Sequence, residues 1–152
     1  MTTDLRTRVL IVDPHNSRAA QRELLEVVLA DRCTVVGDCG SAAEALAMVE
    51  LEQPQVVLTG LMPKGMPGVA LIRTLAQRYP ALGLIVWTFH DSPEYVRDAM
   101  RAGARGYILK SAPIDDVGLA IAAVLAGGRF LSQGVVNPDD RAQGGGQGGV
   151  HG

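Results

Sequence analysis

The sequence predicts an α/β domain in which five parallel strands alternate with five helices around one doubly wound sheet. Three observations support this prediction: short apolar runs rich in β-branched residues recur along the chain, segments with helical periodicity separate them, and turn residues mark the boundaries. Strands that are apolar throughout are typical of parallel sheets covered by helices on both faces. In such sheets, ligands bind at the carboxyl ends of the strands, where the strand order reverses.

The first two strands and helices occupy residues 8–52. Residues 8–12 form an apolar run that ends at Asp13, and residues 17–30 follow with leucine and valine at helical spacing. Residues 33–39 are predicted to form the second strand. Ser41 and Glu44 then form a capping-box pattern, which predicts a helix that ends near residue 52.

The remaining elements follow the same alternation. Residues 55–59 are predicted to form the third strand, and a loop rich in glycine and proline leads to a helix that ends near residue 79. Residues 84–88 form the fourth strand, Ser92 and Pro93 open the next helix, and residues 106–109 and 113–126 form the last strand and helix. The rule for parallel sheets then selects four positions at the carboxyl ends of strands: Asp13, Gly60, Thr88 and Lys110.

Composition indicates a single domain of ordinary globular character. The chain has 152 residues, 47% of them hydrophobic and 20% charged. A net charge of -2 gives no electrostatic reason to expect binding to nucleic acid or to an anionic membrane. No apolar run is long enough to cross a bilayer, and the first residues lack a signal peptide, so we expect a cytoplasmic protein without a membrane partner.

Two further features concern the domain boundaries and the cysteines. Residues 6–133 are predicted to form the domain, and residues 134–152, which are rich in glycine, are predicted to form a flexible tail. Cys33 and Cys39 lie six residues apart on one predicted strand. Their Cα atoms would be roughly 20 Å apart, whereas a disulfide needs about 4.4–6.8 Å, so free thiols are expected.

Four stretches carry a family pattern: residues 9–15, 54–68, 86–91 and 102–110. Their order and spacing resemble the response-regulator receiver (CheY-like) family, in the subtype usually joined to a helix-turn-helix output domain. The resemblance implies a flavodoxin-like sheet with strand order 2-1-3-4-5. It also implies phosphoryl transfer from a kinase histidine to an aspartate at the end of the third strand, with Mg²⁺ held by two acidic residues after the first. On this resemblance Asp13 matches one acid, Thr88 the hydroxyl, Lys110 the lysine and Tyr107 the aromatic switch residue.

The departures from the family pattern all surround the same predicted pocket. Gly60 stands at the phosphoacceptor position and has no side chain, so it offers no nucleophile. Pro14 replaces the second acid, and Phe89 replaces a small residue beside Thr88, where a ring should crowd an incoming phosphate. We therefore expect weak or absent Mg²⁺ binding, no other cofactor and no enzymatic activity.

Several pocket residues have two interpretations. Asp13 is expected to serve as the counter-ion of Lys110, because an unpaired buried lysine is costly, and at most as a weak metal ligand. Thr88 is either a vestigial switch hydroxyl or a β-branched residue at a strand end. Tyr107 is expected to be an ordinary strand aromatic with its hydroxyl near the surface; the alternative is a residue that still rotates between inward and outward positions.

Two surface features bear on partners. Arg97, Arg101 and Arg105 lie four residues apart and form a basic stripe, which is either a solvated face or a partner-binding face. The last helix is more apolar than one buried side requires. Packing on the sheet explains most of this, and a homodimer contact is the alternative.

The leading hypothesis is a degenerate (pseudo-)receiver of a two-component phosphorelay protein. It would act as a phosphorylation-independent interaction module that binds a protein partner, such as a sensor kinase or another regulator. One alternative is a small-molecule or anion sensor that uses the pocket near Lys110; another is a phosphoacceptor that uses an atypical residue. Nucleic acid is not expected as a partner, because output helices would follow residue 133 and the remaining stretch is short and polar.

Overall fold

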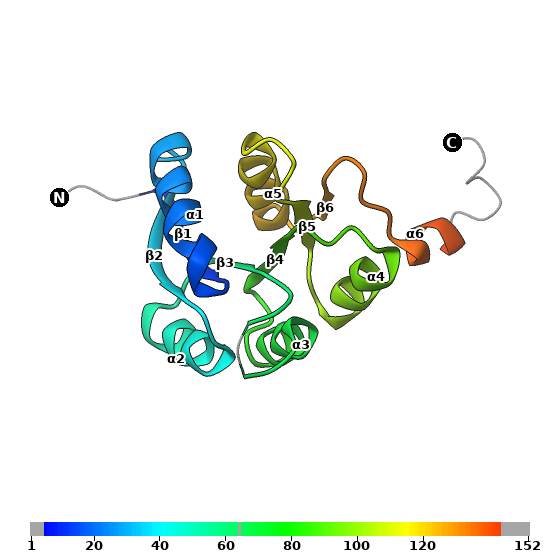
Figure 1. Cartoon of the computed structure of the whole chain (residues 1–152), viewed down its shortest axis with the longest axis horizontal. Helices are drawn as coiled ribbons and strands as arrows, with labels where there is room; N and C mark the ends of the chain where they lie inside the picture. Colours follow the sequence, from blue (N-terminus) through cyan, green and yellow to red (C-terminus); the bar gives the residue numbers. More distant parts are fainter. Residues whose placement is uncertain (1–4, 64, 144–152) are drawn as a thin grey trace.

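The structure is a computed structural model that describes residues 5–63 and 65–143. Strands and helices alternate along the chain (Figure 1). In order they are β1 (Thr7–Val12), α1 (His15–Val28), β2 (Cys33–Cys39), α2 (Ala42–Glu52), β3 (Val56–Thr59), α3 (Gly68–Arg78), β4 (Gly83–Thr88), α4 (Pro93–Ala102), β5 (Gly106–Leu109), α5 (Asp115–Leu125), β6 (Phe130–Leu131) and α6 (Pro138–Gln143).

The strands form one parallel sheet in the order β2-β1-β3-β4-β5-β6. This confirms the predicted doubly wound α/β fold and the order of its first five strands. The predicted total of five strands is wrong, because β6 adds a sixth strand at the β5 edge. Phe130 N donates to Arg105 O at 2.9 Å and Ser132 N donates to Tyr107 O at 3.0 Å. A strand of two residues has no periodicity that a sequence can display, which explains the omission.

Helices cover both faces of the sheet (Figure 1). Alternate residues of each strand enter two hydrophobic cores, one beneath α1 and α5 and the other beneath α2, α3 and α4. Leu25 of α1 and Ile121 of α5 belong to the first core, whereas Leu71 of α3 and Val96 of α4 belong to the second. Within the described residues, no helix combines the length and the apolar character needed to span a bilayer.

The chain after β6 stays on the domain as far as it is described. Val135 and Asn137 are buried, and α6 lies beside α4. The segment from Val135 to α6 therefore lies against the domain, which differs from the flexible tail expected from residue 134 onward. Residues 144–152 of that expected tail lie outside the described residues, and the domain boundary at residue 133 stays a prediction.

Cys33 and Cys39 carry free, buried thiols, as their spacing predicted. Burial raises the pKa of Cys39 to about 12 and also raises that of Cys33. The two thiols are therefore neutral at physiological pH and behave as small apolar groups of the cores.

Candidate functional site

Four strands bring the candidate residues together at the carboxyl end of the sheet, where the strand order reverses between β1 and β3. Asp13 follows β1, Gly60 follows β3, Thr88 ends β4 and Lys110 follows β5. Backbone hydrogen bonds hold these positions in register: Gly60 N donates to Val12 O at 2.9 Å, and Lys110 N donates to Thr88 O at 2.7 Å. Their convergence follows from the parallel sheet alone, because all of its strands have their carboxyl ends on the same side.

Asp13 and Lys110 form a buried ion pair. Lys110 Nζ lies 2.8 Å from Asp13 Oδ2, and the two side chains are only 13% and 6% exposed, respectively. Gln21 Nε2 of α1 donates to the same oxygen at 3.1 Å. The counter-ion arrangement expected for Asp13 is thus present. Gln21 was not among the residues singled out from the sequence, although it lies four residues before the buried Leu25 and therefore on the same side of α1.

The Asp13 carboxylate lies against Gly60. A β-carbon added at Gly60 would be 3.2 Å from Asp13 Oδ2 and 3.3 Å from Asp13 Oδ1. Such distances are closer than ordinary van der Waals contact, so the carboxylate occupies the space beside the end of β3. A side chain at residue 60 would therefore require the Asp13 carboxylate to shift by a few tenths of an ångström.

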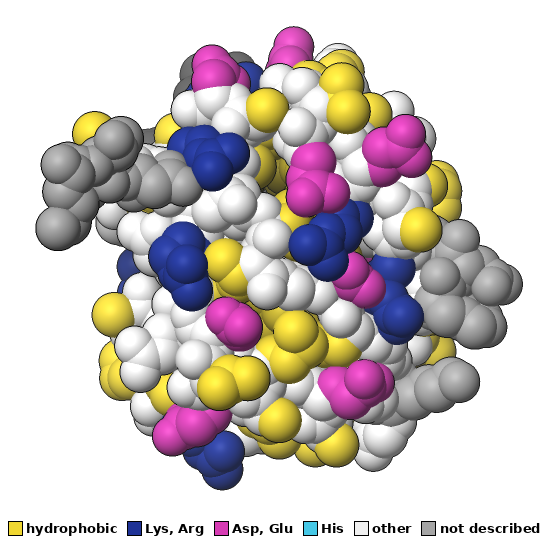
Figure 2. Space-filling view, turned by 90° about the vertical axis from the view of Figure 1, so that its left-hand side faces the viewer, with side chains coloured by type: hydrophobic (Ala, Val, Ile, Leu, Met, Phe, Trp, Pro, Cys, Tyr) yellow, Lys and Arg dark blue, Asp and Glu magenta, His cyan; other side chains and the backbone are white. Residues whose placement is uncertain are grey.

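Two arginines of α1 bind Asp38 of β2, and one of them, Arg18, also reaches the backbone of Asp13. Arg18 Nη1 donates to Asp13 O at 3.2 Å, and Arg18 Nε lies 3.0 Å from Asp38 Oδ1. Arg22 Nη1 donates to Asp38 Oδ2 at 2.7 Å, and this hydrogen bond raises the pKa of Arg22. Figure 2 shows the face that carries α1, β2 and α2, where acidic and basic side chains are interspersed.

These contacts do not fit a Mg²⁺ site. Mg²⁺ is held by carboxylate and other oxygen ligands, whereas the one carboxylate here already receives an ammonium and an amide donor. A divalent ion would have to displace Lys110 from Asp13. Over residues 5–63 and 65–143, no three His, Cys, Asp or Glu side chains are grouped so that they could hold a metal ion.

The residues that flank the ion pair differ in exposure. Thr88 is buried, and its Oγ1 accepts a hydrogen bond from His90 N at 3.3 Å. Phe89 is 72% exposed, with its ring centroid 5.4 Å from Lys110 Nζ. The ring therefore lies close to the outer side of the ammonium group, where it provides a cation–π contact. Pro14 is half-buried and directly precedes α1.

Tyr107 of β5 is fully buried, and its hydroxyl donates to His90 O at 2.6 Å. Burial raises the pKa of this phenol. The expectation of a hydroxyl near the surface is not met, because the β4–α4 loop supplies a carbonyl acceptor. The ring packs in the core beneath α4, together with Val96.

The basic stripe is divided by its neighbours. Arg97 Nε lies 3.4 Å from Asp98 Oδ1 on the same helix, and Arg101 forms a bidentate pair with Asp139 of α6. Arg105 lies beyond the end of α4 and is exposed. The stripe is therefore not a uniform basic face.

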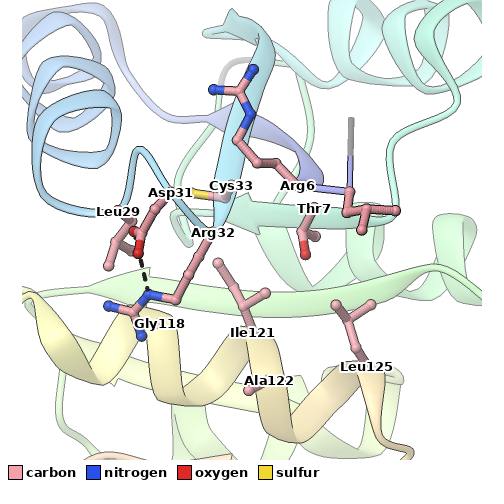
Figure 3. Close-up of a pocket in the computed structure, with 11 residues that line it drawn as sticks. Arg6, Thr7, Leu29, Asp31, Arg32, Cys33, Gly118, Ile121, Ala122 and Leu125 are labelled. Carbon is pink, nitrogen blue, oxygen red and sulfur yellow. Dashed lines mark ion pairs between the residues drawn. The ribbon is translucent and has the colours of Figure 1, made fainter. Parts of the chain in front are cut away.

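A separate groove of about 820 Å³ lies near the amino ends of β1 and β2 (Figure 3). Leu29, Ile121 and Leu125 supply apolar walls, and Arg6 and Arg32 add charge.

The buried face of α5 packs on the sheet and consists of Val117, Gly118, Ala120, Ile121 and Val124. Sheet packing thus explains most of the apolar character of this helix, as expected.

Curated proteins and solved structures resemble the chain over most of its length. It is 35% identical over 138 residues to the transcriptional regulatory protein MctR of Rhizobium johnstonii, covering 89% of this chain and 63% of that protein. It is 37% identical over 126 residues to the DNA-binding transcriptional activator DevR/DosR of Mycobacterium tuberculosis, covering 82% and 57%. A LuxR-family response regulator from Aurantimonas superposes with a TM-score of 0.78 at 29% identity, over 95% of this chain and 99% of that one.

The comparisons correct one expectation from the sequence. Nucleic acid was not expected as a partner, yet a similar protein is named as DNA-binding. The structure of an RcsB–DNA complex also superposes with a TM-score of 0.76 at 25% identity, covering 86% of this chain and 65% of that one. The exclusion of nucleic acid is therefore wrong. It rested on net charge and on the residues after 133, whereas the chain spans less than two thirds of the length of these curated relatives.

The sequence model of the protein family described as the response regulator receiver domain matches residues 9–122 of this chain. This range runs from β1 into α5. It includes the carboxyl end of the sheet, where Asp13, Gly60, Thr88 and Lys110 meet. Sequence, topology and solved relatives agree on the same assignment. The chain belongs to the response regulator receiver family.

Proposed function

We propose that this chain is a degenerate receiver, which regulates a two-component signalling protein without being phosphorylated at the end of β3. The observation that carries the proposal is the arrangement at Gly60. By resemblance this residue stands at the acceptor position, and the Asp13 carboxylate lies 3.2 Å from where its β-carbon would be. Phosphoryl transfer requires a nucleophile at that point, and glycine supplies none.

The charges around the site support the same proposal. In a phosphorylated receiver, a lysine and a divalent cation neutralise charge on the phosphoryl group. Here the Lys110 ammonium is already paired with Asp13 at 2.8 Å, and Arg18 donates to the Asp13 carbonyl. An incoming phosphate would have to break the buried pair. Because Asp13 also fills the space beside Gly60, we do not favour the hypothesis of an anion sensor at this pocket.

A single default conformation is the functional consequence that we propose. Tyr107 is buried and hydrogen-bonded to the His90 carbonyl. The face beside it, formed by α4, β5 and β6, would then be presented constantly to its partners. If no aspartyl phosphate forms at residue 60, no phosphorylation-driven shift of population between conformations would occur.

We further propose that the receiver serves a DNA-binding transcriptional regulator in the cytoplasm. The support is the naming of relatives that match these residues, among them a DNA-binding transcriptional activator. The domain would contribute regulation and contacts with proteins, without enzymatic activity of its own.

Intact-mass spectrometry tests the central proposal. The chain is incubated with acetyl phosphate and Mg²⁺, next to a receiver that retains its acceptor aspartate and shows that the donor is active. We expect no gain of a phosphate-sized mass on this chain. A stable phosphate mapped by peptide analysis to Asp13, Thr88 or another pocket residue would contradict the proposal and revive the atypical phosphoacceptor.

A further inference from the structure

Helix α6 is held on α4 and β6 by charged groups. Arg101 of α4 donates through Nε to Asp139 Oδ2 and through Nη2 to Asp139 Oδ1, both at 2.7 Å. Arg129, just before β6, donates through Nη2 to Asp140 Oδ1 at 2.7 Å. Two adjacent carboxylates of α6 thus meet two arginines that lie far apart in the sequence. Such bidentate and charge-assisted contacts are specific in geometry.

The carboxylates are presented by a defined turn. Asn137 is buried, its Oδ1 accepts from Asp139 N at 3.1 Å, and its backbone oxygen accepts from Asp140 N at 3.1 Å. Asp139 and Asp140 lie in the first turn of α6, where the helix dipole favours negative charge. The turn orients both carboxylates toward α4 and the start of β6.

The segment before α6 is anchored much more firmly than α6 itself. Ser132 is buried, its N donates to Tyr107 O at 3.0 Å, and its Oγ accepts from Leu109 N at 3.0 Å. Val135 packs in the core beneath α4, and Gly134 between them has a φ of 88°. A left-handed backbone at a glycine permits a bend between the anchored part and the helix.

By contrast, the ion pairs that hold α6 are exposed. The side chains are 62% exposed at Arg101, 32% at Asp139, 51% at Arg129 and 37% at Asp140. Exposed pairs contribute little stability and are screened by salt. A helix of six residues is also too short to be stable alone. The contact is therefore specific in geometry but weak in strength, which is the combination expected of a replaceable contact.

We propose that Arg101 and Arg129 form a docking surface for a pair of adjacent carboxylates, which α6 occupies as a replaceable internal ligand. An acidic segment of a partner protein with two neighbouring carboxylates would compete with α6 for the two arginines. The surroundings favour a short acidic segment over a long polyanion, because α4 also carries the acidic residues Glu94 and Asp98. Since β6 is hydrogen-bonded to β5 beside Tyr107, the state of this surface is linked to the buried core of the receiver.

A peptide of residues 134–143 with a fluorescent label serves as the probe, and anisotropy measures its binding to the whole chain. In the wild type, α6 competes from within the same molecule, which lowers the apparent affinity. The variant Asp139→Asn with Asp140→Asn removes the internal carboxylates. We expect it to bind the peptide about five to ten times more tightly than the wild type does. The matched control Asp115→Asn with Asp116→Asn removes the same charge at α5 and should bind as the wild type does.

A second comparison tests the surface itself. Adding Arg101→Gln to the variant that lacks the two carboxylates should abolish the gain in peptide affinity, while circular dichroism verifies that the fold is retained. Equal peptide binding by wild type and the carboxylate variant would overturn the internal ligand. Unchanged binding after Arg101→Gln would overturn the assignment of the surface. Displacement of the peptide by duplex DNA at lower concentration than by unlabelled peptide would show a phosphate surface and overturn the preference for carboxylates.

Discussion

Replacing Lys110 by methionine tests the ion pair on which the proposed function depends. The substitution keeps a long apolar stem but removes the ammonium that lies 2.8 Å from Asp13 Oδ2. Removing one partner of a buried pair leaves a carboxylate with less compensation, at a cost of about 3–5 kcal/mol. Two features lower this figure: Gln21 still donates to the same oxygen, and Lys110 is 13% exposed. We therefore expect a loss of about 2–3 kcal/mol in the free energy of unfolding.

The single tryptophan makes the measurement direct. Trp87 is buried in β4, next to the site, so its fluorescence reports unfolding in urea. For a domain of this size, the expected loss corresponds to a decrease of roughly 5–10 °C in the melting temperature. The midpoint in urea should fall while the slope of the unfolding free energy stays the same, because the surface exposed on unfolding does not change.

A double-mutant cycle separates the pair from general damage to the site. Asp13→Asn leaves Lys110 without its carboxylate, and the double variant Asp13→Asn with Lys110→Met removes both charges. We expect the double variant to be more stable than the sum of the single effects predicts, by at least about 1.5 kcal/mol. If Lys110→Met costs less than about 0.5 kcal/mol, or if the two effects simply add, then the ion pair does not hold the site together.

Three other perturbations test separate parts of the structure. Gly60→Ala places a methyl group 3.2 Å from Asp13 Oδ2 and should lower the free energy of unfolding by about 1–2 kcal/mol, because the pinned carboxylate must move; unchanged stability in urea would contradict this. The hydrogen bond from Arg101 lowers the pKa of Asp139, so this contact is present above the ordinary carboxyl pKa of about 4 and is lost as the pH falls through the lower folded value. We therefore expect the protection of the α6 amides, relative to their intrinsic exchange rate at each pH, to be lost only in acid. Absence of protection at neutral pH would argue against a formed contact. With a pKa of about 12 and 1% exposure, the Cys39 thiol should resist iodoacetamide at pH 8 far longer than a free peptide thiol, whereas modification at the free rate, mapped by mass spectrometry, would show that the thiol is accessible.

Local signals in the sequence were reliable where the partner lies within one turn. The N-cap predicted at Ser41 was confirmed, since Glu44 N donates to Ser41 Oγ at 3.2 Å; the Ser41 hydroxyl also donates to Glu44 Oε1 at 3.0 Å. Ser92 shows the limit of the same reasoning. Its hydroxyl donates to the Glu94 carboxylate, but its oxygen accepts no capping hydrogen bond from the backbone of α4.

Features that depend on residues far away in the chain were not predicted from the sequence. The two residues of β6 gain their strand character only from pairing with β5. Arg18 and Gln21 are polar residues of α1, and both donate hydrogen bonds to Asp13. Periodicity describes which side of a helix is apolar and does not reveal what a polar side chain will meet across the sheet.

The sequence by itself determined the alternation of strands and helices and the edge at which Asp13, Gly60 and Lys110 would meet. Both follow from local patterns, since apolar runs define the strands and parallel strands end at one edge. Only the tertiary structure decided that the Asp13 carboxylate leans against Gly60 and accepts a hydrogen bond from Gln21, and that α6 folds back onto α4. The reason is physical: such contacts depend on side-chain direction and on distances of a few ångströms across the fold, which no pattern along the chain encodes.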